Sequence, residues 1–504
     1  MADFLGFIQA ANSLFIALII LGLGVGAAVA SVLYVVDISQ TRHAIRRNYP
    51  VIGRFRYLFE YVGEFFRQYF FAQDREEMPF NRAQRAWVYR AAKNLDSTVA
   101  FGSTRTLRVP GELIFVNAPF PTLDEEAVAP RLVQVGGSSC RVPYFQDSLI
   151  NISAMSFGAL SVPAVRSLSM GAAKAGCWLN TGEGGLSPHH LAGNCDIIFQ
   201  IGTAKYGVRD LDGRLDEGRL SEIAGLECVR MFEIKLAQGA KPGKGGILPG
   251  AKVTPEIARI RGIPVGKDSI SPNRHPEIDS VDGLLDTIDY VRVVTGKPTG
   301  FKTVIGDRGW LDDLCRAIHK RGVASAPDFI TIDSADGGSG AAPQSLIDYV
   351  GLPIQESLPA VVDCLAEWGL TDRVRVIASG KLINPADVAW ALCMGADFVN
   401  SARGFMFAMG CIQAMQCNRN TCPTGITTHD PRLQRGLVPA DKAERVAHYV
   451  KNMEKEVCSI AHSCGVAEPR ALGREHCRII QPDGRSRSMA EVHPLPAATR
   501  TVAT

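Results

Sequence analysis

The feature that most constrains the fold of this chain is a regular alternation of short apolar segments with amphipathic ones from about residue 149 onward. Eight segments have the length and composition of buried strands: 149–154, 177–180, 197–201, 231–236, 301–305, 329–333, 374–378 and 398–401. Helix-like stretches lie between many of them, at residues 163–175, 255–261, 281–294, 311–320, 358–368 and 385–394. This alternation predicts an α/β fold of the (β/α)8 TIM-barrel type, with a doubly wound sheet as the alternative.

The composition is that of an ordinary globular protein with a large hydrophobic core. The chain has 504 residues, of which 46% are hydrophobic and 21% charged, enough for a barrel with additional segments. The formal net charge is only +3, so composition gives no reason to expect a nucleic-acid partner. The 13 cysteines are scattered along a long chain, which favours a reducing compartment over a secreted disulfide framework.

The N-terminal region predicts a membrane anchor. Residues 14–36 carry no charge, and as a helix they would be roughly 35 Å long, more than the ~30 Å hydrocarbon core of a bilayer. No Lys or Arg precedes this segment, and five arginines follow it: Arg42, Arg46, Arg47, Arg54 and Arg56. The positive-inside rule therefore predicts a single-pass protein of the inner membrane with its catalytic domain in the cytoplasm.

Two other interpretations of this segment exist. A cleaved signal peptide would use the Ala-Val-Ala sequence at 28–30, but the basic region that begins such signals is missing. A buried core helix is the second alternative. The next segment, residues 57–71, mixes many aromatic residues with Glu64 and Arg67, as an interfacial segment does.

Four regions are expected along the chain. Residues 1–40 form the anchor, and residues 41–145 form an N-terminal interfacial and extension region. The barrel occupies residues 146–480, and residues 481–504 form a short C-terminal tail.

Polar residues and glycines follow the predicted strands. They occupy 155–158, 181–185, 238–241, 336–340 and 379–380. The carboxyl ends of the strands are where such barrels place their active sites, so we expect the site at this end. The turn at 336–340 exposes backbone N–H groups of the kind that hold phosphate or flavin edges, although an ordinary loop is the alternative. Neither a Rossmann GxGxxG nor a GxxxxGK[ST] motif occurs in the right context.

Several cations point to an acidic ligand. Lys235, Lys241 and Lys244 lie close together among glycines that let the backbone approach a ligand, and Arg261 follows one helix later as a candidate carboxylate clamp. A solvated basic loop is the alternative. Lys302 lies inside a predicted strand, where its charge needs a ligand or an ion partner. Beside a flavin it would stabilise the reduced form, and a strand-end lysine reaching solvent is the alternative.

Three thiols lie within twelve residues in the arrangement Cys411-x5-Cys417-x4-Cys422. Closely spaced thiolates can hold an iron–sulfur cluster, whereas this spacing fits a structural zinc site poorly. Three buried cysteines that simply pack are the alternative.

Taken together, these motifs resemble the FMN-binding synthase domain of glutamate synthases. The resemblance covers roughly residues 90–480 and rests on motifs in the same order: 155–158, 180–185, 235–246, 336–340 and the cysteine trio with Pro423. The chain is identified as a stand-alone, membrane-anchored member of the FMN-binding glutamate synthase family.

The resemblance implies an FMN-dependent barrel with a three-iron, four-sulfur (3Fe–4S) cluster on Cys411, Cys417 and Cys422. It implies catalytic roles for Glu183, Lys235 and Lys241, with Glu183 handling protons. It implies 2-oxoglutarate binding by Gln238, Lys241 and Arg261. The implied FMN contacts are Met155, Ser156, Asn180, Gln200, Lys302, Gly337, Gly338, Gly340 and Gly380.

The implied activity is the reductive amination of 2-oxoglutarate to L-glutamate, an oxidoreductase reaction on CH–NH2 donors. Ammonia or another amine is the nitrogen source. Electrons come from an external donor, either a ferredoxin-like protein or an NAD(P)H-dependent reductase. A homo-oligomer is compatible with the sequence.

The chain departs from the large synthases in lacking a glutaminase, a β-helix and a nicotinamide-binding domain, and in carrying Lys381 and Arg403 after the last two strands. Three alternatives follow. The chain could be an amine–glutamate (N-alkylglutamate) synthase, or another FMN barrel such as a 2-hydroxy-acid oxidase or a type 2 isopentenyl-diphosphate isomerase. It could also be a non-catalytic, membrane-tethered flavin and iron–sulfur electron-transfer subunit.

Overall fold

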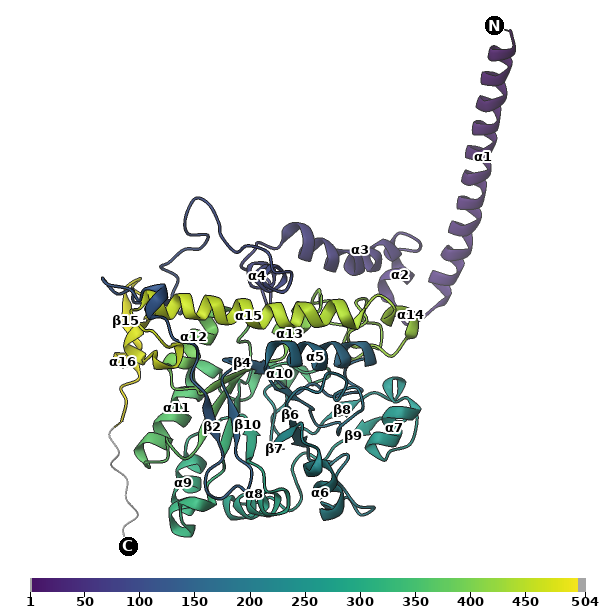
Figure 1. Ribbon diagram of the computed structural model, residues 1–504. Coiled ribbons are helices and arrows are strands. Elements are labelled where there is room, and N and C mark those ends of the chain that lie inside the picture. The colour runs from purple at the N-terminus through teal and green to yellow at the C-terminus, as the bar shows by residue number, and fades with distance from the viewer. Residues whose placement is uncertain (1, 497–504) are drawn as a thin grey trace. The chain divides into compact units, whose positions relative to one another are not determined.

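The computed structural model describes residues 2–496. The chain divides into two compact units, and the division falls between Ala83 and Gln84. Figure 1 shows the second unit as strands surrounded by helices, with the long helix α15 beside them. The residues of the predicted tail beyond 496 lie outside the described part of the chain, whereas 481–496 contain strand β15 (Ser486–Ser488) and helix α16 (Met489–Val492).

Eight parallel strands form a closed barrel in the order β10-β11-β12-β13-β4-β5-β6-β7. The strands are β4 (Ile150–Ile152), β5 (Leu179–Asn180), β6 (Ile197–Ile201), β7 (Val229–Lys235), β10 (Thr299–Thr303), β11 (Phe329–Asp333), β12 (Arg375–Ser379) and β13 (Phe398–Ser401). Asn400 of β13 pairs with Asn151 of β4, which joins the last strand to the first. The predicted (β/α)8 barrel is therefore confirmed, and the doubly wound alternative is wrong.

Helices cover the barrel between the strands. They include α5 (Val162–Ala175), α7 (Pro255–Arg261), α8 (Val281–Thr295), α9 (Gly309–Arg321), α11 (Ile354–Glu367) and α12 (Pro385–Cys393). Local sequence explains where they begin. The side chains of Ser161 and Thr254 accept hydrogen bonds from backbone N–H groups in the first turns of α5 and α7, and each helix has a proline at its start.

The amino-terminal end of the barrel is closed by the hairpin of β2 (Val133–Val135) and β3 (Tyr144–Gln146). Its buried residues share one apolar cluster with residues at or near the starts of the barrel strands: Trp178, Ile198, Met231, Phe329, Ile377 and Phe398. This packing leaves the opposite, carboxyl-terminal end of the barrel for the loops that carry the predicted site.

The second unit has further elements. Strand β1 (Leu113–Phe115) pairs with β14 (Cys477–Ile480), which pairs with β15. Helix α15 (Pro439–Ser463) packs on α5 and α12 through an apolar face that includes Val446, Val450 and Met453.

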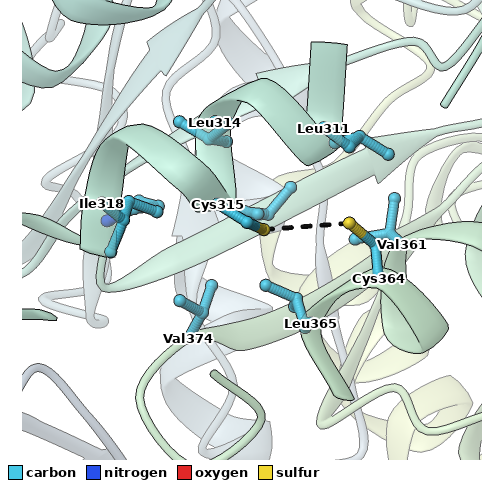
Figure 2. A pocket seen from close by; sticks show the side chains of 10 residues that line it. Leu311, Leu314, Cys315, Ile318, Val361, Cys364, Leu365 and Val374 are labelled. Carbon is cyan, nitrogen blue, oxygen red and sulfur yellow. Dashed lines mark hydrogen bonds between the residues drawn. The ribbon is translucent and has the colours of Figure 1, made fainter. Parts of the chain in front are cut away.

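A small apolar cavity lies between α9 and α11 (Figure 2). Its lining is aliphatic apart from Pro327 and two cysteines, and the Sγ atoms of Cys315 and Cys364 are 3.8 Å apart. None of the predicted site residues lines it. We interpret this cavity as a packing gap of the helix layer.

The first unit begins with α1 (Ala2–Ser39), followed by α2 (Ala44–Asn48), α3 (Gly53–Phe66) and the π-helical turn η1 (Arg67–Phe71). Within residues 2–496, one helix is long and apolar enough to cross a membrane, over Phe4–Ser39. None of its most apolar stretch is buried, which disfavours the core-helix alternative.

Candidate active site

Predicted site residues from three loops meet at the carboxyl-terminal end of the barrel. Lys235 is the last residue of β7, and its Nζ donates hydrogen bonds to Glu183 Oε2 (2.9 Å), after β5, and to Gln238 Oε1 (2.7 Å). Gln238 Nε2 donates in turn to the Gly338 carbonyl (3.1 Å), in the loop after β11. Gly246 allows this approach, because a Cβ there would collide with the Glu183 carboxylate.

Three cations control the charge of Glu183. Burial alone would raise the pKa of this carboxyl, but Lys235, Lys241 and Arg261 outweigh it and lower the pKa to about 2. Burial lowers the pKa of Lys241 to about 8, partly opposed by Glu183. Its Nζ donates to the Ala341 carbonyl (3.0 Å). Glu183 is therefore a stable anion at neutral pH, whereas the Lys241 ammonium titrates close to neutrality.

Arg261 ends α7 and is 5% exposed. Its Nη1 donates to Ser269 Oγ (3.3 Å) and its Nη2 to the Phe157 carbonyl (3.1 Å), while the guanidinium lies over the Tyr206 ring. Its buried Nε has no hydrogen-bond partner among residues 2–496. Protein groups thus hold both terminal nitrogens of the guanidinium in place, whereas the Nε–H is not used by them.

Three consecutive carbonyls after β4 are held by three side chains. The carbonyls of residues 157, 158 and 159 accept hydrogen bonds from Arg261 Nη2 (3.1 Å), His429 Nε2 (2.9 Å) and Lys252 Nζ (2.6 Å) respectively. Lys252 Nζ also donates to the Cys417 carbonyl (3.3 Å). This arrangement ties the predicted substrate cation Arg261 to the segment 411–429, here called the cysteine loop.

Lys302 pairs with Asp333 on the neighbouring strand, with 3.1 Å between Nζ and Oδ2. Asp333 also accepts hydrogen bonds from the Gly239 backbone N–H and from Ser379 Oγ, both at 3.0 Å. Burial opposes the charge of Lys302, but Asp333 and Glu233 raise its pKa. Lys302 is only 5% exposed, so the solvent-reaching alternative is wrong, and its ion partner is a protein carboxylate.

A second carboxylate, Glu233 of β7, organises the barrel interior. Asn180 Nδ2 (2.8 Å) and Gln200 Nε2 (2.6 Å) both donate to its Oε1, and Thr331 Oγ1 donates to its Oε2 (2.6 Å). The predicted cofactor residues Asn180 and Gln200 thus lie together and bind one protein anion. No sequence motif indicated Glu233 or Asp333, although both are charges within apolar strands, the same signal that identified Lys302.

The glycine turn after β11 lies beside two cations. Lys381 Nζ pairs with Asp336 Oδ2 (3.0 Å), and Arg403 Nη2 donates to the Asp336 carbonyl (2.8 Å). Gly380, after β12, has φ +114°, and a Cβ there would collide with Ser334. The turn itself contains Gly337, Gly338 and Gly340, and Gly340 has open space on its Cβ side.

Met155 and Ser156 follow β4. Met155 is buried, and its carbonyl accepts a hydrogen bond from His190 Nε2 (3.0 Å). Ser156 lies against Gly182 of the loop after β5. These two predicted cofactor residues thus lie next to the loop that carries Glu183.

The three thiols share the cysteine loop. Burial raises the pKa of Cys411 to about 12 and raises that of Cys417. Burial also opposes ionisation of Cys422, but the Thr424 hydroxyl, 3.3 Å away, helps to lower its pKa. Within residues 2–496, no group of three or more His, Cys, Asp or Glu side chains is arranged to hold a metal ion. The cluster on these cysteines therefore stays a prediction.

The fold and these contacts define a (β/α)8-barrel protein with a buried charge cluster at the end where such barrels carry active sites. Residues 125–467 match the model of the family described as the conserved region in glutamate synthase. The chain belongs to the glutamate synthase family, as the sequence motifs predicted.

Known relatives agree. The glutamate synthase large subunit-like protein YerD of Bacillus subtilis strain 168 is 40% identical over 490 residues, covering 90% of this chain and 93% of that protein. The archaeal glutamate synthase (NADPH) of Methanocaldococcus jannaschii is 36% identical over 66% of this chain, which spans 62% of that relative. A flavocytochrome b2 double mutant with pyruvate bound has a TM-score of 0.45 and 14% identity, covering 89% of this chain and 93% of its own. That similarity is too low to bear on function.

Proposed function

We propose that the chain is an FMN-dependent oxidoreductase that reductively aminates 2-oxoglutarate to L-glutamate. The observation that carries this proposal is the convergence of Lys235, Lys241 and Arg261 on one half-buried carboxylate, Glu183, in a member of the glutamate synthase family. The substrate has two carboxylates and a keto group. A site that holds several cations in a largely buried setting suits such a dianion.

The residues at the barrel mouth fit FMN. The glycine turn at 336–340 suits a phosphate group, because its backbone lies beside the guanidinium of Arg403; Lys381 adds a second cation there, which pairs with Asp336. Lys302 adds a buried positive charge nearer the barrel interior. FMN bound there would supply the hydride that reduces the imine of 2-oxoglutarate.

The thiol groups of the cysteine loop are suitable ligands for an iron–sulfur cluster. Cys411, Cys417 and Cys422 provide sulfur ligands only, and the positive charge of Lys252 acts on two of them, Cys417 and Cys422. The three cysteines would hold a 3Fe–4S cluster, which stores and passes single electrons. We propose that an external donor supplies these electrons, either a ferredoxin-like protein or an NAD(P)H-dependent reductase.

The side chains around Glu183 would bind the substrate and transfer protons. Lys241 and Arg261 would bind the substrate carboxylates and orient the keto carbon. Glu183, with a pKa near 2, accepts hydrogen bonds and would hold an ammonium or iminium nitrogen by charge. This suggests a revision of the proton-handling role expected for Glu183. Lys241, with a pKa of about 8, is better placed to give or take a proton at neutral pH.

We further propose that α1 anchors the protein in the inner membrane as a single span, with the barrel in the cytoplasm. The length and composition of Phe4–Ser39 and the arginines that follow support this placement. Carbonate extraction of membranes tests it, because a spanning helix stays with the bilayer whereas a peripheral protein is released.

The test of the activity is formation of L-glutamate from 2-oxoglutarate and 15N-labelled ammonium with a chemical reductant, followed by NMR. We expect Lys241→Met and Arg261→Gln to raise the KM for 2-oxoglutarate strongly. Lys244→Met removes an exposed lysine of the same loop and is the matched control. Unchanged kinetics in both variants would refute the substrate assignment. If methylamine replaces ammonium and yields N-methylglutamate at a higher rate, the chain is an N-alkylglutamate synthase.

A further inference from the structure

The helix α3 and the turn η1 carry a continuous apolar face. Large apolar residues recur at spacings of three and four residues, which places them on one side of a helix. They are Ile52, Phe55, Leu58, Phe59, Val62, Phe65, Phe66, Tyr69 and Phe70. We call these residues the aromatic stripe. All except Val62 are exposed, and Phe59 and Phe70 are 68% and 74% exposed.

The opposite side of the helix is charged. This side carries Glu60, Glu64 and Arg67. The preceding helix, α2, adds Arg46 and Arg47. The guanidinium of Arg46 lies over the Tyr57 ring, with 4.6 Å between Cζ and the centroid. A helix that is apolar on one side and carries cations and aromatic rings at its borders fits the boundary between lipid headgroups and acyl chains.

An ion pair between a buried carboxylate and a half-buried guanidinium joins this helix to the end of α1. Asp37 is fully buried and accepts hydrogen bonds from Arg54 Nε (2.9 Å) and Nη2 (2.7 Å) and from the Val51 backbone N–H (3.0 Å). Gly53, the first residue of α3, lies close against α2. A Cβ at this position would be only 2.9 Å from the Ile45 carbonyl oxygen, so glycine permits the close approach. Figure 1 shows α2 and α3 following directly at the C-terminal end of α1.

We infer that α3 and η1 form a second membrane contact, with the aromatic stripe inserted in the same bilayer leaflet that α1 leaves. This inference rests on the proposed anchor. Two observations favour a lipid surface as the partner of the aromatic stripe. The Asp37–Arg54 pair keeps the stripe close to the end of a membrane span, and the remaining arginines of α2 and α3, which are Arg46, Arg47 and Arg56, complement anionic headgroups.

The test places one tryptophan on each side of α3 in the full chain. All five native tryptophans lie at position 87 or later, so the signal of the introduced residue is obtained by subtracting the unsubstituted protein. Phe59→Trp probes the stripe, and Glu64→Trp on the charged side is the matched control. Each protein is reconstituted into vesicles of phosphatidylethanolamine and phosphatidylglycerol with brominated acyl chains, which quench only tryptophan in contact with lipid.

We expect quenching at least twofold stronger for Phe59→Trp than for Glu64→Trp, with blue-shifted emission for Phe59→Trp alone. Adding Arg54→Met should lower the Phe59→Trp quenching, since the ion pair that holds α3 is lost. Equal, weak quenching at both positions would overturn the inference. Blue-shifted Phe59→Trp emission without quenching would also overturn it, in favour of a protein partner or a second copy. Carbonate extraction of the same vesicles shows separately whether α1 spans the bilayer.

Discussion

Lys241 should make 2-oxoglutarate binding depend on pH in the mildly alkaline range. Burial lowers the pKa of its ammonium to about 8, so the positive charge is present below pH 8 and is lost as the pH rises through that value. Roughly nine in ten molecules carry the charge at pH 7 and one in ten at pH 9. If the charged form binds the substrate carboxylate, the Kd should rise about tenfold between these two values.

Two substitutions separate charge from shape. Arginine stays protonated throughout this range, so Lys241→Arg should bind with an affinity that changes little between pH 7 and pH 9. Lys241→Met removes a charge-assisted hydrogen bond that contributes about 1.5–3 kcal/mol, which corresponds to roughly a 10- to 150-fold weaker Kd at pH 7. Its affinity should also be independent of pH over this range.

Binding is best measured by isothermal titration calorimetry, because the ammonia substrate itself changes protonation with pH and would distort turnover. Lys244→Met should behave like the unsubstituted protein. Equal affinity of the unsubstituted protein at pH 7 and pH 9 would show that the Lys241 charge does not bind 2-oxoglutarate. A loss of affinity in Lys241→Arg as steep as in the unsubstituted protein would show the same.

Three further predictions concern the barrel and its loops. Lys302→Met leaves the buried Asp333 carboxylate without its cation and should cost about 3–5 kcal/mol of stability, measured as a lower Tm. Adding Asp333→Asn should partly restore the Tm, and an unchanged Tm in Lys302→Met would contradict the pairing. Gly380→Ala forces a Cβ into φ +114° against Ser334 and should reduce FMN retention after gel filtration, whereas full retention would show that the turn adapts. Lys252→Met removes the donor to two loop carbonyls and should lower the iron content of protein purified without oxygen, with unchanged iron counting against this role.

Much of the barrel could be predicted from sequence, because its strands are short apolar runs between helices with recognisable starts. The predicted bounds agree for Ile197–Ile201, Phe329–Asp333 and Phe398–Ser401. The strand expected at 301–305 begins instead at Thr299, since Thr299 and Gly300 pair with the preceding strand although neither has the apolar character of a core strand residue. Pairing with a neighbouring strand, which local pattern does not contain, decides such boundaries.

The residues of the candidate site could be predicted from sequence, whereas most of the contacts between them could not. Charges and glycines after the strands indicated the loops of Glu183 and Lys241, and a charge inside an apolar strand indicated Lys302. No local pattern predicted that Lys302 would pair with Asp333, because that contact depends on the register of two strands. Nor did spacing reveal that Lys252 and residue 159 meet, since they lie 93 positions apart and come together only through the fold.

The central claim is that 2-oxoglutarate binds among these cations beside a bound flavin. The most direct measurement is a titration of 2-oxoglutarate into purified full-length protein while the flavin absorption spectrum is recorded. We expect a yellow protein whose spectrum changes saturably in the unsubstituted chain and in Lys244→Met, and much more weakly in Lys241→Met. A colourless protein that takes up no FMN on reconstitution would show that no flavin binds there, and an identical titration curve for Lys241→Met would show that 2-oxoglutarate does not bind at these cations.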